Sequence, residues 1–351
     1  MPAIRYRTLS TAALPVYDAT GVATVPTTET RIPRDTFIRS ILITVDGCVS
    51  ISNTPAPSDM SPMALISGIR LVANGNNTLV NTPAAQMFYL NAYEYECELD
   101  RQNLPLGAAN NQNINFAVAL DFNLFPQVKG DFSCLHPAHL DSSLNLYLDW
   151  NTFLLGLGTN VLLGWFTAHI TLEEVILNDT EVSQYYGGKL EKLLEVRYST
   201  LRKVVDAAYA NYNFEIDMPT GNILQKTLIQ EVNNSLRADW VTAFKITKES
   251  PAPFDVQQFD WRESKVQDMR DYHISVLETN DESTAETQPF IGTTIFDPQQ
   301  GWFANVLGYP VPGIDLRGMK SGDLKYRHVN VAPTGTSWVF MLQKEANTYR
   351  R

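Results

Sequence analysis

The stretch SGIRLVANGNNTLVNTPAAQMFYLNAYEY, residues 67–95, decides how this sequence is interpreted. Apolar side chains occupy alternate positions over residues 69–73, which is typical of a half-buried strand. Asn74 and Gly75 follow, and this pair can supply the positive φ angles that a type I′ hairpin turn requires. Residues 78–80, Thr-Leu-Val, are then expected to form the returning strand. The sequence therefore predicts a β-hairpin at this point of the chain.

A helix is expected directly after the hairpin. Thr82 is suited to cap its first turn, and Pro83 is suited to the first helical position, where a missing N–H costs nothing. Polar and apolar residues then follow at helical spacing, which predicts an amphipathic helix over residues 83–97. The residues at this spacing are Gln86, Leu90, Tyr93 and Cys97.

Composition points to a globular, β-rich protein of two domains. The chain has 351 residues, more than a single core usually holds. Hydrophobic residues make up 44% and charged residues 19%, which is too apolar for a disordered chain. The net charge of −11 argues against a surface built to neutralise phosphates. Three widely spaced cysteines, Cys48, Cys97 and Cys134, form no disulfide framework and fit a reducing compartment.

Two segments precede the hairpin. Residues 37–45 are dense in β-branched side chains and are expected to form a strand that ends at a turn made by Asp46 and Gly47. Residues 53–63 contain three prolines and are expected to form a loop.

Three strand patterns follow the helix. Strict alternation of apolar side chains predicts half-buried antiparallel strands over residues 114–124 and 144–150. Residues 162–177 are expected to form one long strand with a kink near Gly164. The first half of the chain thus contains enough strands for a complete β-sandwich.

The second half repeats this organisation without repeating the residues. Its strand candidates are residues 227–232, 240–247, 272–278, 289–296 and 337–343. The last candidate is apolar on both faces, so we expect it to be central or buried. Residues 256–269 fit a helix as an alternative to a strand, which leaves the strand limits there open.

A polar segment separates the halves. Residues 181–198 contain a Gly-Gly pair and are expected to turn partly helical. We therefore expect an N-terminal arm over residues 1–36, a first domain over 37–185 and a second over 186–351. Many short strands with long loops in both halves predict a mainly β protein with two tandem β-sandwiches.

The two ends of the chain carry arginines. Arg5 and Arg7 have no acidic residue near them in the sequence, and the chain ends in Arg350 and Arg351. Solvated termini would explain these residues, and an anionic layer facing both ends is the alternative. The first residues lack the apolar core of a signal peptide, and no run of about 18 apolar residues occurs.

One histidine cluster deserves weighing as a metal site. Cys134, His136 and His139 form a Cys-x-His-x-x-His pattern whose side chains are all zinc ligands. Pro137 interrupts the segment and a fourth ligand is not apparent, so a loop is the favoured interpretation. His169 lies within a strand pattern and is expected to be a structural residue of the sheet.

No other pattern indicates catalysis. The sequence contains no nucleophile elbow, phosphate loop or dinucleotide fingerprint. The acidic pair Glu173 and Glu174 is expected to lie at a solvated strand edge. Most tryptophans lie within apolar strand patterns and are expected in cores or interfaces, whereas Tyr185 and Tyr186 are expected to be exposed. The tryptophans are Trp150, Trp165, Trp240, Trp261, Trp302 and Trp338. We therefore predict no catalytic, cofactor-binding or metal-binding residue.

The strand-turn-strand-helix unit over residues 69–91, with the preceding strand over 37–43 and the tandem β organisation around it, resembles major capsid proteins of the double jelly-roll family. Such proteins form the shells of tailless icosahedral viruses, bacteriophages among them, that often carry an internal membrane. The resemblance spans residues 37–345. It implies two tandem jelly-roll barrels, over residues 37–185 and 186–351, with short helices in the loops between strands.

The resemblance also implies a function. A chain with two similar lobes can form a homotrimeric, pseudo-hexagonal capsomer that tiles an icosahedral facet. Its implied partners are other copies of itself, penton or minor capsid proteins, and internal membrane lipids near the arginine-bearing ends. Neither a cofactor, nor enzymatic activity, nor sequence-specific nucleic-acid binding is expected. The implied location is the virion, after assembly in the host cytoplasm.

Two other functions stay open on the sequence. A carbohydrate- or receptor-binding β-sandwich, such as a viral spike or tail component, would show exposed Trp and Tyr side chains around a groove. A metal-dependent, bicupin-like double-barrel enzyme would hold stoichiometric metal. The helix-rich capsid fold of tailed phages is disfavoured because no long spine helix is visible.

Overall fold

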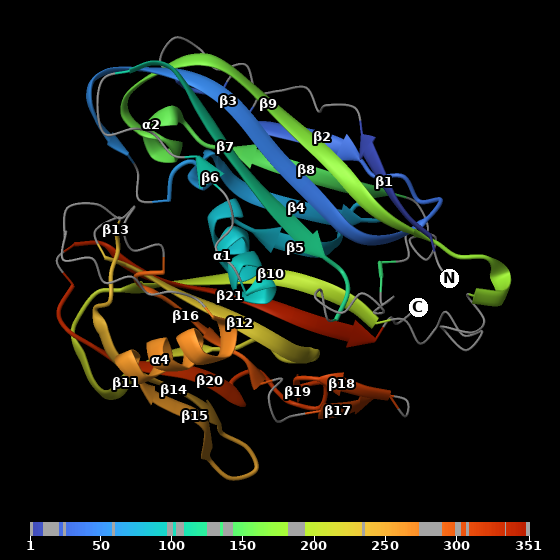
Figure 1. Cartoon of the computed structure of the whole chain (residues 1–351). Helices are drawn as coiled ribbons and strands as arrows, with labels where there is room; N and C mark the ends of the chain where they lie inside the picture. Colours follow the sequence, from blue (N-terminus) through green and yellow to red (C-terminus); the bar gives the residue numbers. More distant parts are fainter. Residues whose placement is uncertain are drawn as a thin grey trace. The chain divides into compact units, whose positions relative to one another are not determined.

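The computed structural model in Figure 1 divides the chain into two compact units. Unit 1 comprises Met1–Ser199 and Thr348–Arg351, and unit 2 comprises Thr200–Asn347. The structure describes residues 3–9, 21–23, 26–57, 60–96, 101–102, 109–124, 134–135, 143–181, 194–233, 236–273, 290–298, 303–306, 309–333 and 335–348. No helix in these ranges is both long and apolar enough to cross a membrane.

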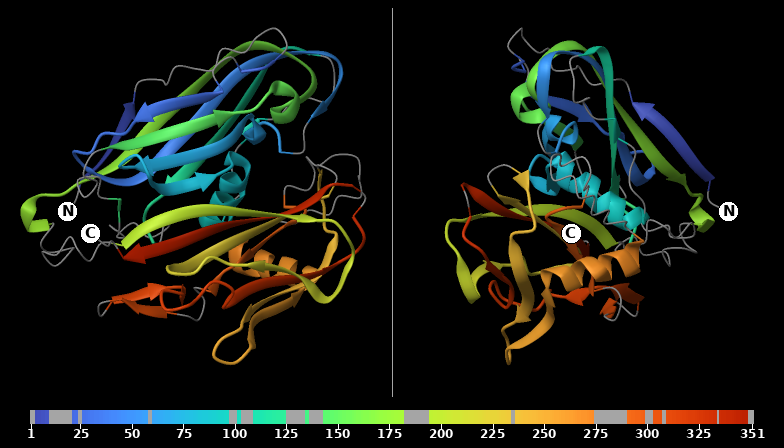
Figure 2. Two further views of the ribbon diagram at one scale, coloured as in Figure 1. Left: turned by 180° about the vertical axis from the view of Figure 1, so that it is seen from behind. Right: turned by 60° about the vertical axis from the view of Figure 1, so that its left-hand side comes forward.

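Unit 1 contains two sheets that lie face to face (Figures 1 and 2). The first sheet has the order β1 (Ala3–Leu9), β9 (Gly158–Ile176), β3 (Phe37–Pro57), β7 (Ala109–Asp121) and β6 (Arg101–Gln102). The second contains β5 (Asn77–Thr82), β4 (Ile66–Ala73), β8 (Leu144–Trp150) and β2 (Thr27–Arg31). The start of β10 (Leu194–Val205) pairs in parallel with β5, and the other strand pairs within the described part of these two sheets are antiparallel.

The core of unit 1 comes from alternating side chains, as the sequence predicts. The strand predicted over residues 144–150 is β8, whose even-numbered residues are buried and whose odd-numbered residues are half-buried. Strand β7 presents its apolar side to the same core. Its buried residues and those just after it are Ile114, Phe116, Val118, Leu120, Phe122 and Leu124.

The hairpin prediction is confirmed. Strands β4 and β5 are joined by Asn74 and Gly75, whose φ angles are 54° and 78°. The N–H of Asn76 donates to the carbonyl of Ala73 at 3.3 Å, which closes a turn of the type I′ kind.

The helix prediction needs two corrections. Helix α1 (Ala84–Tyr95) has Pro83 as its N-cap, with φ −64° and ψ 148°, so Thr82 is not the cap. The helix is also not amphipathic, because it has no solvent-exposed face: every residue from Ala84 to Glu94 is buried. The helix packs against β4 and β7, and a polar side chain such as Asn91 finds hydrogen bonds there instead of water.

The turn predicted at Asp46 and Gly47 is wrong, because β3 continues through both residues. Asp46 pairs with Asn115 and Gly47 with Ile114. The glycine is needed for packing: a Cβ at Gly47 would lie 2.2 Å from Cδ1 of Phe166. Strand β3 then continues to Pro57, so part of the loop expected over residues 53–63 is strand, followed by a short 3-10 helix, η1 (Met63–Leu65).

The kink predicted near Gly164 is confirmed as a bulge in β9. Cys48 of β3 pairs with Trp165, while the next residue, Val49, pairs with Leu163, so Gly164 is passed over. The stretch expected to form an arm, residues 1–36, contains strands β1 and β2. A short helix, α2 (Phe153–Gly156), precedes β9.

Unit 2 is also built from two main sheets. One contains β13 (Leu236–Arg237), β12 (Ile223–Asn233), β21 (Ser337–Thr348) and β10, and β12 also pairs with β16 (Thr293–Phe296) and β19 (Ile314–Asp315). The other has the order β11 (Tyr209–Asp217), β20 (Leu324–Asn330), β14 (Val241–Lys248) and β15 (Phe254–Asp260). Strands β17 (Phe303–Val306) and β18 (Tyr309–Pro312) form a separate ribbon. Large side chains fill the core, among them Phe214, Trp240, Phe244, Trp261 and Tyr326.

Most expected strands of the second half are present. The apolar run at 337–343 lies within β21, which is largely buried and central, between β12 and β10. The helix alternative for residues 256–269 holds for their second part, since β15 ends at Asp260 and α4 (Trp261–Tyr272) follows. The strand expected over 272–278 is wrong at Tyr272, which closes α4, and residues 274–278 lie outside the described ranges. The segment expected to turn helical before residue 198 is strand β10 from Leu194 onward.

Candidate functional site

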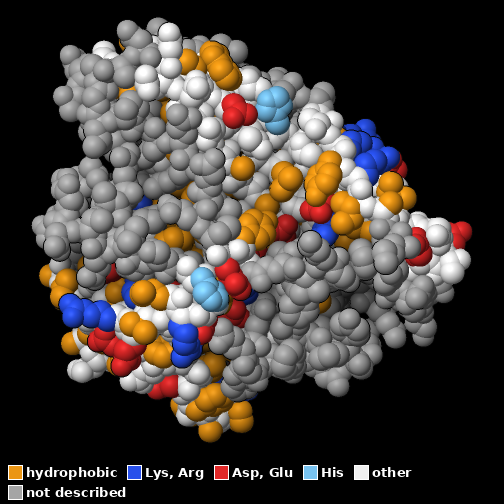
Figure 3. Space-filling model, viewed as in Figure 1, with side chains coloured by type: hydrophobic (Ala, Val, Ile, Leu, Met, Phe, Trp, Pro, Cys, Tyr) orange, Lys and Arg blue, Asp and Glu red, His pale blue; other side chains and the backbone are white. Residues whose placement is uncertain are grey.

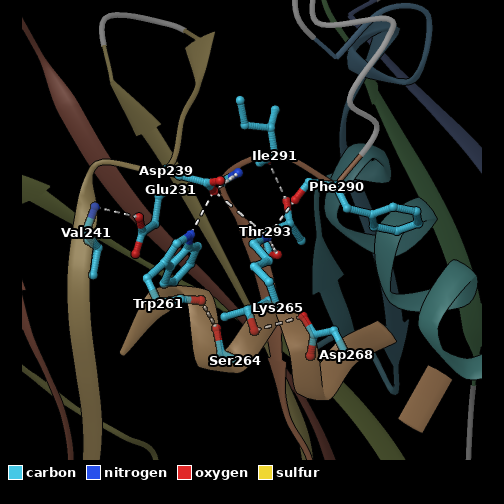
Figure 4. Close-up of polar contacts among 12 residues, drawn as sticks. Glu231, Asp239, Val241, Trp261, Ser264, Lys265, Asp268, Phe290, Ile291 and Thr293 are labelled. Atoms are coloured by element: carbon cyan, nitrogen blue, oxygen red, sulfur yellow. Dashed lines mark hydrogen bonds and ion pairs between the residues drawn. The ribbon is translucent and has the colours of Figure 1, made fainter. Parts of the chain in front are cut away.

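Helix α4 of unit 2 carries a polar buried face, which is the chemically most distinctive feature of the described chain (Figure 4). Asp260 caps the helix and exchanges hydrogen bonds with Glu263 in a capping box. Trp261, Lys265, Asp268 and Tyr272 then recur at intervals of three or four residues and therefore lie on one face. All four are buried, although three are polar and the fourth carries an indole N–H.

This face is docked to the segment around β16 by hydrogen bonds. The Lys265 ammonium donates to the carbonyl oxygens of Phe290, at 2.7 Å, and Thr293. The hydroxyl of Thr294 donates to Asp268 at 2.9 Å. A buried polar face is stable only where its groups are paired in this way.

Asp239, which precedes β14, lies next to Trp261 at the start of this face, and its own side chain is 42% exposed. Its Oδ1 accepts hydrogen bonds from Trp261 Nε1 and from the N–H of Gly292, each at 2.7 Å. Lys265 Nζ lies 3.9 Å from that oxygen. An indole, a backbone amide and an amine therefore converge on one carboxyl group.

A second carboxyl group, Glu231 of β12, is fully buried nearby. One of its oxygens accepts from the N–H of Val241 at 3.3 Å. Burial raises the pKa of Glu231 well above its usual range, and the charge of Asp239 raises it further. Burial also lowers the pKa of Lys265, against the opposing effects of Asp239, Asp268 and Glu231. Both shifts favour the uncharged forms of these two groups.

Unit 1 has a buried ionic site of its own at Glu174 of β9. Its side chain is fully buried and accepts hydrogen bonds from Arg5 Nε at 2.8 Å, from the Arg7 guanidinium and from the Thr36 hydroxyl at 2.6 Å. Arg7 also donates to Asp35 at 2.8 Å, and this bond lowers the pKa of that carboxyl. The two arginines thereby fix β1 to the edge of the five-stranded sheet.

Two sequence expectations are corrected by this site. Arg5 and Arg7 do have acidic neighbours, because pairing of β1 with β9 brings Glu174 between them. Glu174 is also not at a solvated edge, since β1 and β3 cover β9 on both sides. Its neighbour Glu173 points to the other face and lies near Tyr6 and Arg39.

The histidine and cysteine candidates are not brought together in the described chain. Cys134 is buried against Phe37 and Val175, whereas His136 and His139 lie outside the described ranges. His169 is half-buried on β9, as expected of a sheet residue. Within the ranges that the structure describes, no three His, Cys, Asp or Glu side chains are grouped so that they could hold a metal ion.

The tryptophans are divided between core and surface. Trp150, Trp240 and Trp261 are buried, as the sequence predicts, whereas Trp165 is 52% exposed. Trp302, Tyr185 and Tyr186 lie outside the described ranges. Lys265, Asp239 and Glu231 were not singled out from the sequence, because the helical spacing of Trp261 and Lys265 carries no recognised motif.

Exposed hydrophobic side chains provide candidate contact surfaces in both units. Figure 3 shows small groups of hydrophobic side chains among polar atoms on one face of the molecule. Those of unit 1 are Ile4, Tyr6, Val22, Leu154, Leu155, Leu162, Trp165 and Ile176. Those of unit 2 are Val204, Phe254, Val266, Met269 and Val331. Apolar and aromatic residues of this kind are enriched in the centres of protein interfaces.

The architecture has counterparts among solved structures. The crystal structure of the STIV MCP, from Sulfolobus Turreted Icosahedral Virus, superposes with a TM-score of 0.76 at 16% identity, over 99% of this chain and 97% of that one. The fold of this chain is the double jelly roll. PBCV-1 VP54 matches this double jelly roll with a TM-score of 0.61 at 12% identity, over 99% of this chain and 94% of that one. The major capsid protein P2 of bacteriophage PM2 matches with a TM-score of 0.55 at 11% identity, over 99% of both chains.

These counterparts are recognised by structure alone. No protein-family model matches the sequence, and no curated protein matches it either. At such low identity the agreement is one of fold, and few side chains are shared.

Proposed function

We propose that this double jelly-roll chain is the major capsid protein of a tailless icosahedral virus. The observation that carries the proposal is the end-to-end match to the STIV MCP, which covers 99% of one chain and 97% of the other. Both jelly rolls, and not one module, are therefore shared. The match to the PM2 major capsid protein supports the same function.

The proposed building block is a homotrimer. Two jelly rolls per chain give three subunits six similar lobes, and a closed ring of this kind can tile a flat facet. Exposed aromatic and aliphatic residues such as Trp165, Leu154 and Leu155 are suited to contacts between copies. The acidic net charge of −11 would keep free capsomers soluble.

Other virion components would complete the shell. Penton or minor capsid proteins are needed wherever a six-lobed capsomer does not fit, such as the five-fold vertices. Arg5 and Arg7 are paired with Glu174 and Asp35, so contact of these arginines with lipid headgroups of an internal membrane would have to compete with these ion pairs. The proposed location is the virion, after assembly in the host cytoplasm, and the proposed role is structural, without enzymatic activity.

Solution mass tests this function. Light scattering on a sizing column should show a species of about three times the chain mass of 39.4 kDa that persists on dilution. Electron microscopy of concentrated samples should then show sheets or shells with six-lobed units. Replacement of Trp165 by Ser should shift the mass toward the monomer, whereas replacement of the half-buried Thr167, two residues along β9, by Ser should not.

A monomer at every concentration, without any sheets or shells under assembly conditions, would contradict the proposal. Glycan-array binding or stoichiometric metal in that monomer would then favour one of the two other functions named from the sequence.

A further inference from the structure

The surroundings of Lys265 are those of a nucleophilic amine. Its Nζ is buried in unit 2, and two of its protons point to the carbonyl oxygens of Phe290 and Thr293. On its remaining side, Nζ lies 3.9 Å from Oδ1 of Asp239 (Figure 4). When that third proton leaves, the nitrogen lone pair takes its place and faces the carboxyl group.

The Asp239 carboxyl is arranged as an electrophile. Trp261 Nε1 and the N–H of Gly292 both donate to the same oxygen, Oδ1, at 2.7 Å. Two donors on one oxygen withdraw electron density from Cγ and would stabilise the oxyanion that forms on attack. Trp261 and Lys265 are one helical turn apart on α4, so one rigid helix presents both the donor and the amine.

Glu231 can move the protons that the reaction requires. It is fully buried and one of its carboxyl oxygens, Oε1, makes no hydrogen bond within the part of the chain that the structure describes. Burial raises its pKa well above the usual range and the charge of Asp239 raises it further, which favours the protonated, proton-donating form. Burial lowers the pKa of Lys265, which increases the fraction of free amine.

We propose that Lys265 and Asp239 condense to form an intramolecular amide that covalently ties α4 to the segment before β14. This site and its chemistry stand independently of the proposed capsid function.

The reaction balances without a co-reactant. Lys265 first passes one proton to the Asp239 carboxylate, which gives a free amine and a carboxylic acid. Nζ attacks Cγ, and Oδ1 becomes the oxyanion held by Trp261 and Gly292. Glu231, in its protonated form, gives its proton to the departing Oδ2 hydroxyl and takes the second proton from Nζ in return. The Cγ–Oδ2 bond breaks, one water molecule leaves and a secondary amide remains, with no change in oxidation state.

Mass spectrometry of the full-length folded protein tests the proposal directly. The intact mass should be lower than the sequence mass by one water molecule. Trypsin should not cleave after Lys265, and a branched species should join residues 238–245 to residues 263–270. Fragmentation should place the branch at Asp239 and Lys265, which distinguishes the amide from loss of water elsewhere.

Three variants and one matched control sharpen the test. Lys265→Arg and Asp239→Ala should restore the sequence mass, and Glu231→Gln should slow or abolish formation of the amide. Lys226 is the control, since it is also largely buried and its Nζ lies 3.6 Å from Asp297. Lys226→Met should leave the branched species intact.

The wild-type protein decides the question even where a variant fails to fold. An intact mass equal to the sequence mass, with an unbranched peptide over residues 238–245 and normal cleavage after Lys265, would overturn the proposal. A branched species that forms at the same rate in Glu231→Gln would overturn the role given to Glu231.

Discussion

The side-chain amide of Asn91 pairs with the backbone of Ala119 as a residue of a neighbouring strand would. Its Nδ2 donates to the Ala119 carbonyl at 3.0 Å, and its Oδ1 accepts from the Ala119 N–H at 2.8 Å. In the described chain, β6 pairs with β7 only at Asn115 and Phe116. Further along β7, at Ala119, the side-chain amide of Asn91 takes the place of a neighbouring strand. Helix α1 is thereby fixed to the sheet through a fully buried residue.

Replacing Asn91 should weaken unit 1 markedly. Asn91→Leu is expected to cost about 2–4 kcal/mol, because it leaves two buried backbone groups of Ala119 without partners. Chemical denaturation monitored by tryptophan fluorescence measures the loss. Asn113→Ala, at an exposed position of β7, is the control and should change stability by less than about 0.5 kcal/mol. Equal stability of the two variants would show that the amide pair is unimportant.

Neutralising Glu174 should release the N-terminal strand. Glu174→Gln leaves Arg5 and Arg7 without their shared carboxylate, and we expect a loss of about 1–3 kcal/mol, because the two arginines are partly exposed. Hydrogen exchange of residues 3–9 should accelerate more than exchange in β8. The matched control is Glu173→Gln, one residue away on the other face, which should leave the exchange of β1 nearly unchanged. Similar exchange in both variants would contradict the anchoring role.

Unit 2 should lose stability in acid through His328. The ring is fully buried, stacks on Phe214 at 4.1 Å and lies 3.2 Å from the Tyr326 hydroxyl, and burial lowers its pKa to about 3. The folded state keeps this ring neutral, whereas the unfolded chain takes up a proton below the ordinary pKa of about 6.5. The free energy of unfolding is therefore highest above about pH 6.5 and decreases as the pH falls toward 3. Each unit of the shift corresponds to about 1.4 kcal/mol, so the total effect is a few kcal/mol.

Thermal unfolding between pH 7 and pH 4 measures this effect. The wild type should lose several degrees of melting temperature across that range, and His328→Gln should lose less. His169→Gln, at a half-buried histidine of unit 1, should retain the wild-type slope. A His328→Gln profile parallel to that of the wild type would assign the acid sensitivity to other groups.

Gly47 should tolerate no side chain. Gly47→Ala places a Cβ 2.2 Å from the Phe166 ring, and we expect a loss of about 1–3 kcal/mol from the forced repacking. Addition of Phe166→Leu should recover part of this loss, which a double-mutant cycle would show as coupling. Gly318→Ala is the control, since a Cβ there meets nothing within 4 Å. Additive effects of Gly47→Ala and Phe166→Leu would rule out the proposed steric cause.

The local pattern of the sequence determined much of the fold. Asn74 and Gly75 predicted the turn between β4 and β5 because few residue pairs adopt two successive positive φ angles. Alternation predicted β7 and β8, since a period of two places every second side chain in the core. The solved capsid proteins share this fold at 11–16% identity, so the double jelly roll does not depend on one particular set of side chains.

Local pattern failed where a distant residue changed the outcome. Gly47 lies within a strand instead of a turn because β3 pairs there with β7 and β9, and its missing side chain leaves room for Phe166, far along the chain. Arg5 and Arg7 find Glu174 only because β1 pairs with β9, and neither partner is visible in the neighbouring sequence.

The candidate site in unit 2 was decided by tertiary structure alone. The sequence places Trp261 and Lys265 on one helical face, which follows from their spacing. It does not show that Asp239, Gly292 and Glu231 meet that face. Those contacts arise when α4 packs beside β14, β15 and β16, and burial there changes which groups carry charge. Spacing along the chain thus determined the elements, whereas desolvation and long-range pairing determined their chemistry.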